Sequence, residues 1–88
     1  MNMNACIYVL KLYDGKYYCG TMNFQTYQKK GDAWLNLHKP QQLIQLFCCV
    51  NETSEKEKTL ELMRLYGWQN VRGSIWTDPN MSSPPDEL

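Results

Sequence analysis

The 88-residue sequence has no apolar run that approaches the ~18 residues needed to cross a membrane as a helix. It also lacks a secretory signal, because the opening MNMNA has no charged region followed by an apolar one. These two absences predict a soluble, intracellular protein without a membrane partner.

The sequence is poor in groups that bind metals. It has one histidine, and none of its four cysteines belongs to a C-x-x-C pair, so we do not expect a zinc site. Cys48 and Cys49 are neighbours in a strand-like run and should point to opposite faces, which is unsuited to a disulfide between them. We expect the thiols to be free and to serve as small buried apolar groups.

Net charge is also absent, since nine basic side chains balance nine acidic ones. Residues 1–76 carry all nine basic side chains but six acidic ones, a net charge of +3, which is far below that of a dedicated nucleic-acid binder. The length allows one domain at most. We expect this domain at 1–76, followed by a polar, proline-rich and flexible tail at 77–88.

What the sequence does contain is a strong hairpin signal near its N-terminus. Two segments rich in β-branched and aromatic residues, CIYVLKLY at 6–13 and KYYCGT at 16–21, flank an Asp-Gly turn signal. A two-residue turn would put Tyr8 and Tyr18 on opposite faces. A three-residue turn with a left-handed glycine would pair Tyr8 with Gly20 and would put both tyrosines on one face. The residues alone leave both registers open.

The next elements follow from shorter patterns. One or two helical turns are expected within 23–31, and Asp32 is expected to cap a second short helix that Pro40 ends. The run QQLIQLFCCV at 41–50 is apolar at almost every position after Leu43. It therefore predicts a central strand that is covered on both faces.

The clearest helix is expected at 55–66. Ser54 and Glu57 form a capping box, and Gly67 supplies the C-terminal stop. The apolar stripe of the helix combines Leu60, Leu62, Met63, Leu65 and Tyr66.

After this helix, the segment 70–76 is expected to be extended.

The order of these elements, together with several short motifs, resembles the GIY-YIG nuclease family. Cys6-Ile7-Tyr8 stands where the family has GIY, and Tyr18-Cys19-Gly20 stands where it has YIG. The resemblance covers most of residues 5–76 and implies an α+β fold with a small three-stranded antiparallel sheet flanked by helices. Further segments are similar to small stand-alone members, including ones encoded by large DNA viruses: Ala33-Trp34, Leu37-His38-Lys39-Pro40, Tyr66-Gly67 and Asn70-Val71-Arg72-Gly73.

The family cuts DNA phosphodiester bonds with one divalent metal, which implies Mg²⁺ or Mn²⁺ as the cofactor of an active member. The resemblance implies that the two motif tyrosines, here Tyr8 and Tyr18, share one face and help to orient and deprotonate the attacking water. This favours the three-residue turn. In the family, an arginine on the first helix stabilises the charge on the phosphate, and a glutamate on the later helix holds the metal.

The sequence departs from the family at the charged residues that the family uses to bind the phosphate and the metal. The segment between Gly20 and Trp34 is several residues too short and contains no arginine, and a lysine cannot reproduce the guanidinium fork. The metal-binding glutamate of the family falls near Thr59, and Glu61 substitutes for it only if the helix alignment is off by half a turn. We therefore expect the aromatic part of the site to be kept and the phosphate and metal parts to be lost.

The candidate site residues follow from this resemblance. The remnant catalytic set is Tyr8, Tyr18 and His38. The metal ligand of an active enzyme is Glu61, whereas no cofactor is expected of an inactive one. The candidate nucleic-acid contacts are Lys29, Lys30, Lys39, Asn70 and Arg72.

Each candidate also has a structural interpretation. The tyrosines are typical of cross-strand packing in a sheet, and His38 is typical of a structural hydrogen bond or plain exposure at a helix end. Arg72 has an equal case for pairing with a backbone carbonyl or a carboxylate. The charged residues of 55–64 are typical of a solvated helix face.

Three functions remain open at this point. The first, which we favour, is a degenerate GIY-YIG domain that no longer cuts and that binds nucleic acid, such as DNA, or a protein partner, because losing both the arginine and the metal ligand leaves little turnover. The second is an active metal-dependent endonuclease that uses Glu61 or Glu57 and a lysine. The third is a protein-interaction module, including a homo-oligomer, because three tryptophans and six tyrosines leave apolar surface that a small core does not cover.

Overall fold

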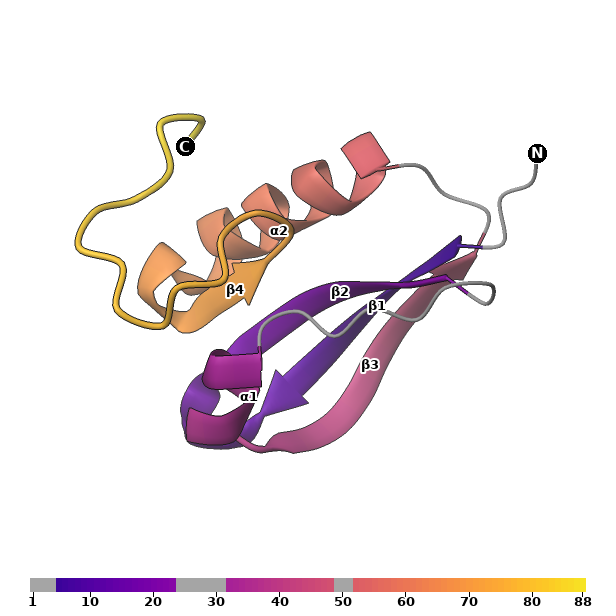
Figure 1. The fold of residues 1–88 in the computed structure, drawn as a ribbon, viewed down its shortest axis with the longest axis horizontal. Helices are drawn as coiled ribbons and strands as arrows, with labels where there is room; N and C mark the ends of the chain where they lie inside the picture. Colours follow the sequence, from indigo (N-terminus) through magenta and orange to yellow (C-terminus); the bar gives the residue numbers. More distant parts are fainter. Residues whose placement is uncertain (1–4, 24–31, 49–51) are drawn as a thin grey trace.

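The structure is a computed structural model that describes residues 5–23, 32–48 and 52–88 (Figure 1). The helical turns expected within 23–31 fall, except for Asn23, outside the described residues, and the candidates Lys29 and Lys30 lie outside them too. The elements in chain order are β1 (Ala5–Leu12), η1 (Tyr13–Gly15), β2 (Tyr17–Asn23), α1 (Asp32–Leu37), β3 (Pro40–Cys48), α2 (Glu52–Tyr66), η2 (Trp68–Asn70) and β4 (Val71–Gly73).

The sheet has four strands in the order β3–β1–β2–β4. β1 is antiparallel to both β2 and β3, whereas β4 is parallel to β2. The α+β class is therefore confirmed, but the sheet is not the expected three-stranded antiparallel one. The difference is β4, because residues 71–73, which we expected only to be extended, pair with residues 17–19 and make the sheet mixed.

The first hairpin has the three-residue turn. Tyr8 pairs with Gly20, and the turn residues Asp14 and Gly15 both adopt left-handed φ angles of 69° and 72°. Tyr8 and Tyr18 consequently lie on one face of the sheet, with their ring centroids 6.2 Å apart. The register favoured by the family resemblance is the observed one.

The sheet separates two hydrophobic clusters. Consecutive side chains of β1 and β2 point to opposite faces, so each strand contributes to both clusters. In Figure 1, α2 runs along the top of the sheet and α1 lies at its lower left. The cluster on the α2 side contains Ile7, Val9, Cys19, Leu60, Leu62, Met63 and Val71. The cluster on the α1 side contains Leu12, Tyr18 and Trp34, with Tyr8, Leu10 and Leu35 packed against it.

α2 differs in detail from the expected helix. It begins at Glu52, so Ser54 lies inside the helix and the predicted capping box is wrong. Gly67 ends it as expected, with φ 95°. Leu65, which we assigned to the apolar stripe, is 65% exposed, because it lies roughly 200° around the helix from the buried Met63. Among the described residues, no helix has the length and apolar character that a membrane crossing requires.

β3 is not the covered central strand that its apolar sequence predicts. It lies at the edge of the sheet, and all of residues 41–47 are exposed. Leu46, for example, is 57% exposed. A continuous apolar run is compatible with a strand covered by its own chain and with one covered by another molecule, and the sequence pattern does not distinguish these cases.

The segment 77–88, which we expected to be a flexible tail, lies against the domain in the structure. The backbone carbonyls of Asp78 and Pro79 accept hydrogen bonds from Arg72. Further along the tail, the Glu87 carboxylate is 3.0 Å from the ammonium group of Lys56 on α2. The last residues therefore run back along α2.

Two of the four cysteines, Cys6 and Cys19, have described side chains, and both are buried, as expected. Cys19 lies in the cluster under α2. Burial raises the pKa of the Cys19 thiol to about 11, so the group stays protonated and unreactive near neutral pH.

The close approach of the two tyrosine rings requires a glycine at position 20. A Cβ atom there would lie 2.6 Å from Cζ and Oη of Tyr8 and 2.7 Å from Cε2 of Tyr18. We expect Gly20→Ala to lower the free energy of unfolding by about 1–3 kcal/mol, because an added methyl group overpacks the contact. Urea unfolding followed by circular dichroism measures this change.

Gly15→Asn is the matched control. A Cβ atom at Gly15 would meet no atom within 4 Å, and asparagine tolerates the left-handed conformation, so we expect a loss below about 1 kcal/mol. A Gly20→Ala protein as stable as the wild type would contradict the observed register.

Candidate functional site

The structure brings Tyr8 and Tyr18 together on the α1 side of the sheet. Their ring planes are inclined by 47°. Tyr18 is 2% exposed and belongs to the same cluster as Leu12 and Trp34, so its ring is part of the core. Tyr8 is half-buried. The pair has the shared face expected of the remnant catalytic set, and it also packs across the strands as the structural interpretation predicts.

His38 lies beside this cluster, at the end of α1. Its ring meets the ring of Trp34 edge-on with centroids 4.5 Å apart, and its Nδ1 atom is 3.7 Å from a carboxylate oxygen of Asp14. Nδ1 is buried and, among the described residues, has no hydrogen-bond partner. Because the Asp14 side chain is mostly exposed, an ion pair with a protonated His38 would be weak. These contacts link His38 to the hairpin turn.

Arg72 pairs with backbone carbonyls, which was one of its two predicted roles. Its side chain is buried, with 2% of the residue exposed, and its guanidinium lies 4.4 Å from the ring centroid of Trp34. Burial lowers the pKa of Arg72, and the charge of Asp78 opposes this effect. Its donors reach four carbonyl oxygens at 2.7 to 3.2 Å, those of Trp68, Val71, Asp78 and Pro79. The guanidinium has about five N–H donors, and its four hydrogen bonds leave few of them to bind a phosphate.

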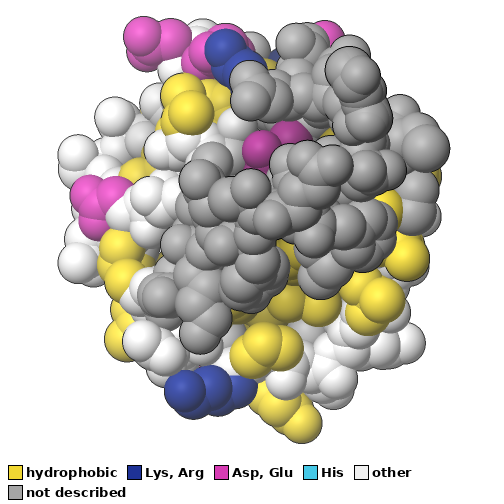
Figure 2. Space-filling view, turned by 45° about the vertical axis from the view of Figure 1, so that its right-hand side comes forward, with side chains coloured by type: hydrophobic (Ala, Val, Ile, Leu, Met, Phe, Trp, Pro, Cys, Tyr) yellow, Lys and Arg dark blue, Asp and Glu magenta, His cyan; other side chains and the backbone are white. Residues whose placement is uncertain are grey.

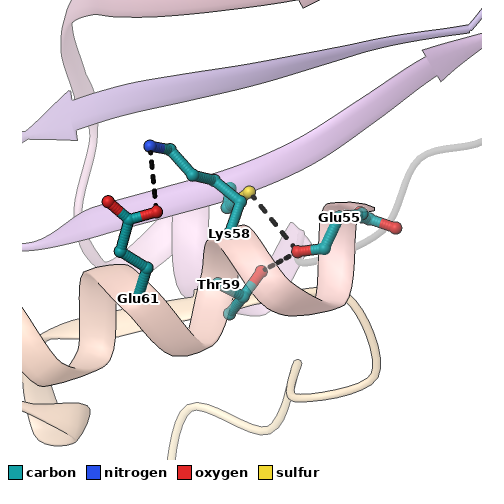
Figure 3. Close-up of polar contacts among 5 residues, drawn as sticks. Glu55, Lys58, Thr59 and Glu61 are labelled. Carbon is teal, nitrogen blue, oxygen red and sulfur yellow. Dashed lines mark hydrogen bonds and ion pairs between the residues drawn. The ribbon is translucent and has the colours of Figure 1, made fainter. Parts of the chain in front are cut away.

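Glu61 lies on the other side of the sheet from the tyrosine pair. Its carboxylate is 3.4 Å from Nζ of Lys58, and Figure 3 shows both side chains on the side of α2 that faces the strands. Both residues line an open groove of about 290 Å³ between α2 and the β1–β3 part of the sheet. The groove is lined by Ile7, Phe47, Ser54, Glu57, Lys58 and Glu61.

Thr59 occupies the position where the resemblance puts the metal-binding glutamate. It is fully buried, and its hydroxyl donates a 2.8 Å hydrogen bond to the carbonyl of Glu55 (Figure 3). The same hydroxyl oxygen would lie 2.9 Å from a Cβ atom at Gly73. A longer, charged side chain would therefore have to displace the packing between α2 and β4.

Within 5–23, 32–48 and 52–88, no three His, Cys, Asp or Glu side chains gather into a group that could hold a metal ion. Glu61 and Glu57 share the groove with the ammonium group of Lys58, which competes for their charge.

The end of the sheet at the hairpin turn gathers polar and aromatic groups from several elements. Lys16 donates a 2.9 Å hydrogen bond to the side-chain carbonyl of Asn70. The amide nitrogen of Asn70 in turn donates to the backbone carbonyl of Tyr66 at 2.8 Å. The Tyr66 ring stacks on Tyr17 with centroids 4.0 Å apart. Burial and then the neighbouring Tyr66 raise the pKa of the Tyr17 phenol.

Tyr13 and Lys39 complete this group on the other side of the turn. The N–H of Tyr13 donates to the carbonyl of Lys39 at 2.9 Å, and both residues are exposed. We call the group formed by Tyr13, Lys16, Lys39, Tyr66 and Asn70 the hairpin-end surface. The sequence analysis named Lys39 and Asn70 as site residues but not the tyrosines of this surface. Strand alternation was the available signal, because it places Tyr17 on the face opposite to Tyr18 and thus towards the predicted helix, where Tyr66 stacks on it.

Comparison with known proteins assigns no family to the chain. No family model matches it, and neither the curated proteins nor the solved structures contain a match. The resemblance to the GIY-YIG family therefore rests on the sequence motifs and remains a prediction.

Arg72→Lys tests the structural role of the buried guanidinium. A lysine cannot reach four carbonyl oxygens at once, so we expect the free energy of unfolding to fall by about 2–4 kcal/mol. Chemical unfolding measures the loss. Arg64→Lys is the control, because Arg64 is exposed and donates one 3.2 Å bond to the carbonyl of Glu87. Equal stability of the two variants would refute this role.

Proposed function

We propose that this chain is a GIY-YIG-like domain that has lost the ability to cut DNA and acts by binding nucleic acid. The loss of cutting is supported by one observation: the sheet lies between the two sets of candidate catalytic groups. Tyr8 and Tyr18 lie on its α1 side, whereas Glu61 lines the groove under α2. A one-metal endonuclease needs its water-orienting and metal-holding groups around the same phosphate. Side chains on opposite faces of a sheet cannot converge in this way.

The distribution of charge supports nucleic acid as the ligand. Residues 1–50 contain five lysines and two acidic residues, a net charge of +3. Residues 51–88 contain four basic and seven acidic residues, a net charge of −3. The part of the chain that forms the first three strands is therefore basic, and the part that forms α2 and the tail is acidic. A polyanion is attracted to the first part and repelled by the second.

The hairpin-end surface supplies suitable contacts through Tyr13, Lys16 and Lys39, which come from the basic part of the chain. Lys39 and Tyr13 are exposed there, and Tyr13 is 54% exposed. Proteins that bind single strands combine cations, which contact the phosphates, with aromatic rings, on which bases stack. In this proposal Lys39 contacts the nucleic acid, whereas Arg72 is committed to the fold and both ends of the Asn70 amide are engaged by Lys16 and by the Tyr66 carbonyl.

A protein partner is a second candidate. The observation that favours it is the exposed apolar surface of β3. A protein bound to β3 would not compete with nucleic acid, because β3 and the hairpin-end surface use different side chains.

The loss of cutting predicts the outcome of a nicking assay. Supercoiled plasmid incubated with the protein and Mg²⁺ or Mn²⁺ should show no more nicked product than plasmid incubated with Tyr18→Phe protein. Each missing electrostatic group costs a factor of about 10²–10³ in rate, so turnover should be lost. Metal-dependent nicking that Tyr18→Phe abolishes would sink the proposal and restore the endonuclease.

Binding is tested separately with fluorescently labelled single- and double-stranded DNA. We expect Lys39→Gln to reduce affinity roughly five- to tenfold near 0.1 M salt and to reduce the slope of log K against log salt by about 1, because one phosphate contact is lost. Fluorescence anisotropy measures both quantities. Lys56→Gln removes the same charge from α2, beside Glu87, and should change neither. Equal effects of the two substitutions would argue against the hairpin-end surface.

A further inference from the structure

Tyr66 presents an aromatic ring at the surface, at the end of α2. The ring stacks on Tyr17 with the centroids 4.0 Å apart and the ring planes inclined by 12°. Although one face of its ring is covered in this way, Tyr66 is 41% exposed. The exposed part of the ring is therefore its second face and its edge. A further planar ring can continue the stack from there.

The ring beneath Tyr66 is held in place by the sheet. The carbonyl of Tyr17 accepts a 2.9 Å hydrogen bond from the indole N–H of Trp34, and Tyr17 pairs with Val71 of β4. The Tyr66 ring thus rests on a fixed support. A ring that is already ordered loses little conformational entropy when a ligand stacks on it.

Asn70 places a cation beside this ring. Its side-chain carbonyl accepts a 2.9 Å hydrogen bond from the Lys16 ammonium group, and its amide nitrogen donates a 2.8 Å bond to the Tyr66 carbonyl. An ammonium group has three N–H donors, so this bond leaves two of them for another acceptor. The bond to Tyr66 also caps a carbonyl at the C-terminal end of α2, where the partial negative charge would oppose an anion.

The charges around the stack also suit an anion, although α2 belongs to the acidic part of the chain. The glutamates of α2 all lie at or before Glu61, and residues 62–77 contain two arginines and no acidic residue. Asp14, the acidic residue of the hairpin turn, lies towards the end of α1, where its carboxylate is 3.7 Å from Nδ1 of His38. The acidic groups of the chain are therefore concentrated away from the Tyr66 ring.

The face of the molecule that Figure 2 brings forward is less suited to a nucleic acid. Among its coloured side chains, Lys and Arg are sparse, and Asp and Glu are visible in the upper half of the view. The stacked tyrosines and Lys16 lie instead where the end of α2 meets the start of β2, at the left of Figure 1. This place combines an ordered ring with an ordered cation.

We propose that the ligand of the hairpin-end surface is a single-stranded nucleic acid, of which one unpaired base stacks on Tyr66 while Lys16 contacts a neighbouring phosphate. This inference rests on the proposed function and deepens it. A base inside a duplex has both faces covered by its neighbours and offers none to an exposed ring. A single strand offers base faces and phosphates together, which matches a ring and a cation that Asn70 holds side by side.

The test compares three fluorescently labelled ligands of about 10 nucleotides: oligothymidylate, an abasic strand with the same phosphates, and a duplex. The wild type should bind oligothymidylate at least about fivefold more tightly than the abasic strand, the fold-change that corresponds to ~1 kcal/mol for one base–aromatic stack. Tyr66→Ala should lose at least that factor for oligothymidylate and keep its affinity for the abasic strand. Fluorescence anisotropy measures these affinities.

Two control variants separate stacking from other effects of a substitution. Tyr66→Phe keeps the ring and should bind oligothymidylate like the wild type. Leu65→Ala removes an apolar side chain from the neighbouring position of α2, where Leu65 is 65% exposed, and should change neither affinity. Far-UV circular dichroism checks that the variants are folded.

Proton NMR on the wild type provides a measurement that does not depend on a variant. The ring protons of Tyr66 should shift on addition of oligothymidylate and stay in place on addition of the abasic strand, because a stacked base adds its ring current. Equal shifts with both strands would overturn the inference.

The outcomes distinguish this inference from the proposed function. Equal affinities for oligothymidylate and the abasic strand would overturn the inference, as would a duplex that binds as tightly as oligothymidylate or a Tyr66→Ala protein that binds oligothymidylate like the wild type. Each of these results leaves binding through Lys39 and the phosphates intact. Failure of all three ligands to bind at low salt would overturn both the inference and the proposed function.

Discussion

The three-residue turn Tyr13–Gly15 sets the register of β1 against β2, and this register decides which sheet face each side chain of the hairpin reaches. A slip of one residue would move every side chain of one strand to the other face. With the observed register, Tyr8 and Tyr18 meet over Gly20, where a Cβ atom would clash with both rings. The same alternation sends Ile7, Val9 and Cys19 towards α2.

Trp34 and Arg72 connect the remaining parts to this sheet. The indole N–H of Trp34 donates to the carbonyl of Tyr17 at 2.9 Å and so anchors α1. Its ring lies against the guanidinium of Arg72, which in turn binds carbonyls of η2, β4 and the tail. A cation that could have contacted a phosphate is thus used to hold the domain together. This use is consistent with the proposal that the chain binds through exposed lysines and does not cut.

Much of the architecture could be predicted from local patterns. The hairpin, the short helix after residue 31, the strand after Pro40 and the stop at Gly67 all follow from turn and cap chemistry within a few residues. The candidate site was harder to predict, because its residues are distant from one another in sequence. Nothing local to Arg72 indicates that the carbonyls of residues 78 and 79 will surround it. The capping box predicted at Ser54 is wrong, because α2 begins at Glu52, before the local signal.

The residues and their order were enough to determine the α+β class, the position of most elements and the crowding of tyrosines in the hairpin, since strand and turn preferences act between neighbours. The folded chain alone decided that Glu61 and the tyrosine pair lie on opposite faces, that Arg72 is buried, and that β3 is an exposed edge. These three outcomes depend on which elements pack together. Periodicity shows that a side chain is apolar or charged, but the partner that covers or faces it is set by contacts between segments far apart in sequence.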